Sequence, residues 1–217
     1  MTALPAQPLS DVDLASLLVS RVCHDLVSPV GAFSTGLDLL AEEEEAEMRD
    51  EALRLLSKSA EAAAAKLQYA RLAFGAAGSA GSEIDLTAAG QLMEGALKGS
   101  KAQLVWQAEA ITAPKDQAKL LLNLAGVAAE ALIRGGTLTV STTTADGTRR
   151  LAAVAEGPSA RLRSELGAAL QGQAPEEGFD GRSAQALFTH RLAAQTGTHI
   201  TVAAGPDRVE LAAVVIL

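Results

Sequence analysis

The sequence predicts an α+β protein, in which an N-terminal helical hairpin is followed by an α/β sandwich with helices on one face of its strands. Three observations lead to this fold class. In the first third of the chain, apolar residues recur at alternating steps of three and four. Residues 76–82, which are almost all small, then read as a flexible linker. Beyond them, strand-like runs alternate with helical ones.

The first helix is predicted from an N-cap at Ser10 to about Ala41, after a disordered lead of residues 1–9 that holds two prolines. Its apolar seam has the seven-residue repeat of a helix that packs on another helix. The seam consists of Val19, Cys23, Leu26, Val30, Phe33, Leu37 and Leu40. Cys23, the single cysteine, is expected to be buried in this seam as a small apolar residue.

The second helix is predicted after an acidic reversal at residues 42–45, which completes a hairpin over residues 10–75. Its seam has the same spacing and consists of Leu53, Leu56, Ala60, Ala63, Leu67, Ala70 and Phe74. Within a hairpin each helix has only one neighbour, so two copies are needed to bury both seams. We therefore expect a homodimer joined through a four-helix bundle.

Residues 83–217 are predicted to form the second domain. Strands are expected at 84–86, 102–107, 137–144, 148–155, 199–204 and 208–216, and helices at 87–98, 114–133, 160–170 and 182–196. The dipeptide Asp146-Gly147 marks a hairpin turn between the third and fourth strands. Pro114 suits the first turn of the second helix of this domain.

His24 lies one residue off the first seam, so its ring is expected to face outward. Pro29 lacks the backbone N–H that would bond the carbonyl of Asp25, which is expected to loosen or kink the helix beyond the histidine. The face that continues from His24 holds the small residues Ser28, Gly31 and Thr35. Such a face lets the backbone of another protein approach, or eases packing within the bundle.

The run from His24 to Val30, His-Asp-Leu-Val-Ser-Pro-Val, resembles the H-box of two-component sensor histidine kinases. In order and spacing, the elements of residues 83–217 resemble the ATP-binding domain of the same kinases, of the Bergerat type. The resemblance implies that His24 is a phosphoacceptor and that Asp25 is an acid able to orient its ring.

The positions that bind ATP and its metal in these kinases are altered in this sequence. Asn123-Leu124 and Gly135-Gly136 match the flanks of the magnesium motif, but its asparagine falls on Val127, which offers no oxygen ligand. The adenine-binding aspartate falls on Ala155, and the glycine-rich phosphate loop keeps only Gly181. The sequence therefore predicts a degenerate ATPase-like domain with no cofactor or metal of its own.

A histidine hairpin joined to a degenerate ATPase-like domain resembles the ChpT-type histidine phosphotransferases of alphaproteobacterial cell-cycle phosphorelays. The resemblance implies transfer of phosphate from the receiver domain of a CckA-like hybrid kinase through His24 to CtrA-like and CpdR-like response regulators. The receiver domain would supply Mg²⁺. We expect partner contacts on helix one at Arg21, Val27, Ser28, Gly31 and Ala32, and on the exposed face of helix two at Leu55, Ser59 and Ala62.

Two other functions remain open: a pseudokinase adaptor that binds receivers without carrying phosphate, and an active ATP-dependent kinase.

The net charge of −8 argues against non-specific nucleic-acid binding. A cytoplasmic protein is expected, because the sequence holds no signal peptide and no apolar run of membrane length. One cysteine cannot form an internal disulfide, no zinc-ligand spacing is present, and His190 and His199 are expected to be structural.

Overall fold

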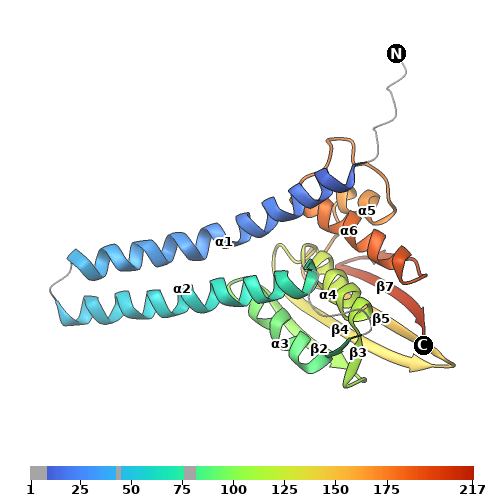
Figure 1. The fold of residues 1–217 in the computed structure, drawn as a ribbon, viewed down its shortest axis with the longest axis horizontal. Helices are drawn as coiled ribbons and strands as arrows, with labels where there is room; N and C mark the ends of the chain where they lie inside the picture. Colours follow the sequence, from blue (N-terminus) through green and yellow to red (C-terminus); the bar gives the residue numbers. More distant parts are fainter. Residues whose placement is uncertain (1–8, 43–44, 76–81) are drawn as a thin grey trace, which may run out of the picture.

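The structure is a computed structural model that describes residues 9–42, 45–75 and 82–217. A long helical hairpin projects from an α/β domain (Figure 1). Most of the predicted disordered lead (1–9), acidic reversal (42–45) and linker (76–82) lies outside the described residues. Leu9, which was predicted to be disordered, packs on the core and accepts a hydrogen bond from Arg191 at 2.8 Å. Within the described part of the chain, no helix combines the length and the apolar character needed to cross a membrane.

The order of elements follows the sequence prediction with one addition. The hairpin consists of α1 (Asp11–Glu42) and α2 (Ala46–Ala73). The helices of the second domain are α3 (Leu86–Leu97), α4 (Lys115–Ala129), α5 (Ser164–Leu170) and α6 (Gly181–Gln195). Its strands are β1 (Glu83–Asp85), β2 (Ala102–Ala108), β3 (Thr112–Pro114), β4 (Gly136–Ala145), β5 (Thr148–Glu156), β6 (Thr201–Gly205) and β7 (Arg208–Ile216).

The added element is β3, which pairs antiparallel with β1. Three residues that end in a proline carry no readable strand period, so the sequence could not reveal this element. Pro114 is the N-cap of α4 rather than part of its first turn. Helix α4 ends at Ala129 rather than Ile133, and α5 begins at Ser164 rather than Ala160.

The main sheet has the strand order β2-β4-β5-β7-β6, in which β2 and β4 are parallel and the other neighbours antiparallel. Its helices lie on one face, as predicted (Figure 1). Alternate residues of β4, β5 and β7 point into the core, among them Leu138, Leu151 and Leu211. Helix α4 is buried along nearly its whole length, so it forms the centre of the domain.

Helix α1 begins as predicted, because the Ser10 side chain accepts a hydrogen bond from the Asp13 backbone at 3.1 Å. The helix packs on α2 through a stripe that includes Pro29 and Gly36, both buried. A Cβ on Gly36 would lie 2.9 Å from Leu56 Cγ, so this close approach requires glycine. The predicted seam is one position away from this stripe. Within one copy Cys23 is exposed, contrary to the expected burial, and Val30 is 53% exposed.

The predicted partner contacts on α2 are wrong in their placement. Ser59 is buried, and Leu55 and Ala62 are half-buried. Leu55 lines a small pocket together with Leu39 of α1, so it lies where the two helices meet. None of the three residues is part of an exposed surface.

The base of the hairpin is joined to the α/β domain by hydrogen bonds from α4. The Asn123 amide, which is fully buried, donates to the Ala73 carbonyl at 2.8 Å. The Lys119 ammonium donates to the Gly75 carbonyl at 2.9 Å, and burial lowers its pKa. These bonds satisfy carbonyls at the end of α2 that no helical N–H can reach.

Candidate functional site

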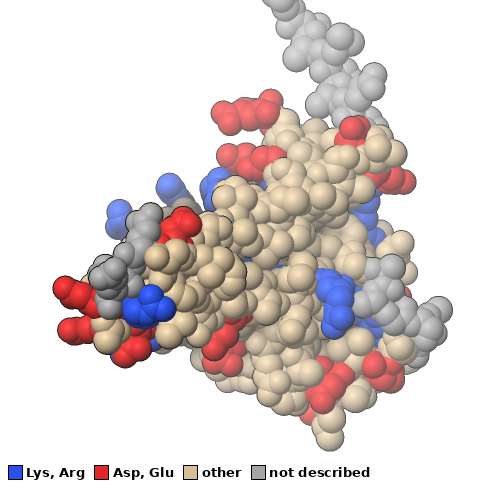
Figure 2. All heavy atoms as spheres, turned by 60° about the vertical axis from the view of Figure 1, so that its left-hand side comes forward, with Lys and Arg blue, Asp and Glu red and all other residues tan. Residues whose placement is uncertain are grey.

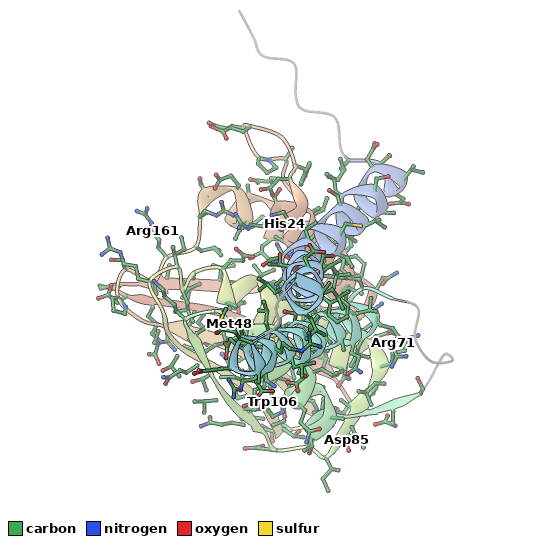
Figure 3. The ribbon with its side chains drawn as sticks, turned by 90° about the vertical axis from the view of Figure 1, so that its left-hand side faces the viewer. His24, Met48, Arg71, Asp85, Trp106 and Arg161 are labelled. Carbon is green, nitrogen blue, oxygen red and sulfur yellow. The ribbon has the colours of Figure 1, made fainter. Side chains whose placement is uncertain are left out.

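His24 lies on the outer surface of α1, close to the α/β domain (Figure 3). Its side chain is 81% exposed, so the prediction that the ring faces outward is confirmed. Ser28, Gly31 and Thr35, which continue the same face of α1, are exposed as well. A Cβ on Gly31 would meet no atom within 4 Å, which leaves open space in front of the helix beyond the histidine.

The histidine borders a groove of about 270 Å³ between α1 and the α/β domain. Its lining on the α1 side is Ser20, Arg21, His24 and Asp25, and on the domain side Glu130, Asp180, Gly181 and Arg182. The first residues of α6 come close to α1, since a Cβ on Gly181 would lie 3.1 Å from Arg21 Cβ. His24 is therefore presented beside the α/β domain and not on the hairpin alone.

Two arginines meet at one carboxylate in this groove. Arg21 Nη2 donates to Glu130 Oε1 at 2.8 Å, and Arg182 Nε lies 3.2 Å from Glu130 Oε2. Burial alone would lower the pKa of Arg21, but Glu130 and Asp25 raise it above its ordinary value. Glu130 thus joins α1, α4 and α6. Arg21, predicted as a partner contact, is only 15% exposed and makes its contacts within the chain.

Asp25 lies between His24 and Arg21. Asp25 Oδ1 is 3.5 Å from His24 Nδ1, and Asp25 Oδ2 is 3.8 Å from Arg21 Nε. Both distances exceed an ordinary hydrogen bond but allow electrostatic interaction. Adjacent residues on a helix point in different directions, which explains why the carboxylate does not sit directly against the ring.

The other predicted contact residues on α1 differ in exposure. Val27 is 68% exposed, Ser28 and Gly31 are exposed, and Ala32 is half-buried. They extend the surface of His24 towards the tip of the hairpin. Figure 2 shows acidic side chains gathered around that tip and a wide uncharged surface behind it.

The two residues predicted to stand in place of kinase ATP ligands are part of the core. Val127 is 1% exposed and Ala155 is fully buried. At the start of α6, the Asp180 carboxylate accepts hydrogen bonds from the backbone N–H groups of Arg182 and Ser183. Burial would raise the pKa of Asp180, but these hydrogen bonds lower it. The helix end that could bind phosphate is thus already occupied by a carboxylate of the same chain.

The other two histidines lie away from this groove. His190 Nδ1 lies 3.0 Å from the Leu170 carbonyl, a contact that joins α6 to α5. Over the residues that the structure describes, no group of three histidine, cysteine, aspartate or glutamate side chains could hold a metal ion.

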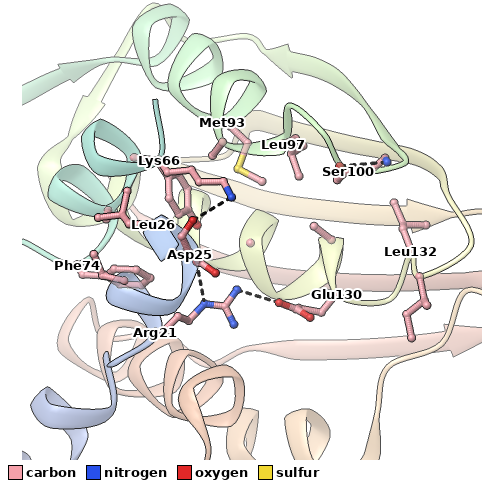
Figure 4. Close-up of a pocket in the computed structure, with 18 residues that line it drawn as sticks. Arg21, Asp25, Leu26, Lys66, Phe74, Met93, Leu97, Ser100, Glu130 and Leu132 are labelled. Carbon is pink, nitrogen blue, oxygen red and sulfur yellow. Dashed lines mark hydrogen bonds and ion pairs between the residues drawn. The ribbon is translucent and has the colours of Figure 1, made fainter. Parts of the chain in front are cut away.

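Sequence reasoning missed Glu130 and Arg182 as members of this site. They lie more than 100 residues beyond His24, and no local sequence pattern links them to it. It also missed Lys66, whose ammonium donates to the Asp25 carbonyl at 3.0 Å (Figure 4). The one available signal was Pro29, which leaves this carbonyl without its helical donor.

Three comparisons relate the chain to known proteins. Residues 86–208 match the family described as the histidine phosphotransferase C-terminal domain. The protein phosphotransferase ChpT of Brucella abortus (strain 2308) is 38% identical over 205 residues, which cover 94% of this chain and 97% of that protein. A solved 1.7 Å structure of a bacterial phosphotransferase superposes with a TM-score of 0.82 at 36% identity, and covers 97% of this chain and 100% of its own. The chain therefore belongs to the ChpT-type histidine phosphotransferase family.

Proposed function

We propose that the chain receives phosphate from a receiver-domain aspartate of a hybrid kinase on His24 and passes it to aspartates of response regulators, without binding ATP. The observation that carries this proposal is the position of His24. Its ring is exposed beside an open groove, while the positions that would hold a nucleotide and its metal are buried and apolar.

The chemistry needs one nucleophilic nitrogen. Nδ1 of His24 faces Asp25, so a tautomer with its proton on Nδ1 leaves the lone pair of Nε2 free. Nε2 attacks the phosphorus of the acyl phosphate. The P–N bond forms as the bond from phosphorus to the aspartyl oxygen breaks, and the carboxylate leaves with that electron pair. The positive charge on the phosphorylated ring is stabilised by Asp25, and transfer to a second receiver reverses these steps.

The partner supplies what this chain lacks. Receiver domains of the CckA-like, CtrA-like and CpdR-like types would bring Mg²⁺ to the groove, so the phosphotransferase needs no cofactor. The receiver would contact Val27, Ser28, Gly31 and Ala32 of α1. The proposed compartment of the protein is the cytoplasm. Arg21 would act from behind the contact surface, through Glu130.

The chain is proposed to work as a homodimer. Large apolar side chains remain exposed along the hairpin in one copy, namely Val19, Val30, Phe33 and Leu37 on α1 and Leu53 and Leu67 on α2. They lie on the two predicted seams, and a second hairpin would cover them to complete a four-helix bundle. Such a dimer would carry two His24 sites.

The test is phosphate transfer in the absence of ATP. The purified chain is mixed with a phosphorylated receiver domain and Mg²⁺, and acid-labile phosphate is assayed on wild type, His24→Ala and Asp25→Asn. We expect label on wild type, none on His24→Ala and slower labelling of Asp25→Asn. A receiver that binds but leaves wild type unlabelled would establish the adaptor. Labelling of His24 by ATP alone would establish the kinase.

A further inference from the structure

Helix α1 continues without interruption through Pro29, from Asp11 to Glu42. Proline has no N–H, so the carbonyl of Asp25 loses the donor that a regular helix would supply. A half-buried carbonyl without a donor costs free energy and lets the local backbone relax. The affected peptide immediately follows the His24-Asp25 pair, so any relaxation moves the residues that carry the chemistry.

The missing donor comes from α2. Lys66 Nζ donates to the Asp25 carbonyl oxygen at 3.0 Å, across 41 positions of sequence. Lys66 is half-buried and reaches the carbonyl along a pocket of about 320 Å³ between the hairpin and the α/β domain (Figure 4). An ionised donor makes a stronger hydrogen bond than the neutral N–H that it replaces.

We propose that Lys66 is a positioning residue for phosphotransfer: through the Asp25 carbonyl it fixes the turn of α1 that carries His24. This inference rests on the proposed function. Lys66 touches no reacting atom. It is half-buried on α2 and lines the pocket behind the helix, whereas the His24 ring is exposed, so a docked receiver meets the histidine first.

The test is a double-mutant cycle between Lys66 and Pro29. Lys66→Met keeps most of the apolar stem and removes the donor, while Lys66→Arg keeps a charged donor. Pro29→Ala returns a backbone N–H to the Asp25 carbonyl. Each variant is labelled by a phosphorylated receiver in single-turnover reactions, and receiver affinity is measured separately.

We expect Lys66→Met to slow labelling of His24 about tenfold with unchanged receiver affinity, because a small misplacement of a reacting group costs up to about 100-fold in rate. Lys66→Arg should retain most of the rate. In the Pro29→Ala background, Lys66→Met should cost less than about twofold, since the helix then supplies its own donor. The carbonyl ¹³C chemical shift of Asp25 should respond to Lys66→Met only when Pro29 is present.

Provided that the wild-type protein is labelled normally, two results would overturn this inference. One is a Lys66→Met variant as fast as wild type. The other is an equal loss with and without Pro29, which would mean that the lysine acts by another route, such as contact with the receiver. A wild-type protein that takes no label from a bound receiver is a different result. It overturns the proposed function, and the role of Lys66 in transfer falls with it.

Discussion

Tyr69 is the only tyrosine of the chain, and it lines the pocket between the hairpin and the α/β domain together with Arg21 and Asp25. Its hydroxyl donates to the Leu122 carbonyl at 3.2 Å and accepts from Gln185 Nε2 at 3.4 Å. Burial raises its pKa to about 12, although Arg21 and the bond from Gln185 oppose the shift. The neutral phenol is therefore the form that the folded protein holds.

We predict that near-ultraviolet absorbance will show this side chain to titrate at an unusually high pH. In the native protein the tyrosinate signal should have its midpoint near pH 12, and in urea near the ordinary value of about 10. The folded pKa lies above the unfolded one, so the stability contributed by Tyr69 is complete below about pH 10. It is lost as the pH rises towards 12. A native midpoint near 10 would show that the phenol is accessible to water.

Among the elements, the Arg21–Glu130–Arg182 cluster joins α1, α4 and α6. We predict that Glu130→Ala will lower the free energy of unfolding by about 2 kcal/mol, because it leaves a largely buried arginine without its hydrogen-bonded partner. Urea denaturation followed by circular dichroism measures this change. The same variant should slow phosphotransfer, since Glu130 forms part of the wall opposite His24.

The chain offers a matched control for this substitution. Arg54 and Glu51 form an ion pair of the same 2.8 Å length, but their side chains are 71% and 69% exposed, against 15% and 21% for Arg21 and Glu130. Glu51→Ala should therefore change stability by less than about 0.5 kcal/mol. Equal effects of the two variants would mean that burial does not set the strength of the Arg21–Glu130 pair.

The elements also show what the sequence can reveal and where it stops. Turn chemistry and alternation located β4, β5 and β7, and Ser10 located the start of α1, because these signals are local. The strand β3 left no such signal. The heptad repeat predicted the two helices but not the faces through which they pack within one copy. Small residues such as Gly36 and Ser59 are buried there, and they carry no apolar periodicity.

As with the fold, the sequence revealed those parts of the site that are close together along the chain. His24, Asp25 and Pro29 are adjacent in sequence and form a motif, so their chemistry could be read directly. Glu130 and Arg182 reach His24 only through the fold, and ion pairs between distant residues have no sequence pattern. Arg21 was predicted as a partner contact, but its spacing on the helix could not reveal the ion pair that it forms with Glu130.

At the scale of the whole molecule, dimerisation can be tested on the exposed seam. For the proposed homodimer, Val30→Glu should lower the mass measured by light scattering from that of a dimer to that of a monomer, because a carboxylate in an apolar interface is costly to desolvate. Val214→Glu is the matched control: Val214 lies on β7 at 51% exposure, close to the 53% of Val30, but away from the hairpin. A Val30→Glu protein that keeps the mass of wild type would place the interface elsewhere.

The degenerate domain provides the last prediction, the absence of nucleotide binding. A ligand present at 100 times its dissociation constant stabilises a protein by about 2.7 kcal/mol, which raises the melting temperature by several degrees. We expect no shift with ATP and Mg²⁺, because Val127 and Ala155 offer no polar group and Asp180 occupies the start of α6. An ATP-binding kinase domain measured alongside should shift. A shift in this protein would mean that nucleotide binds through other residues, and would return the ATP-dependent kinase as a candidate function. Without a shift, the wall that the domain places beside His24 remains as its proposed contribution, and Glu130 at the end of α4 forms part of it.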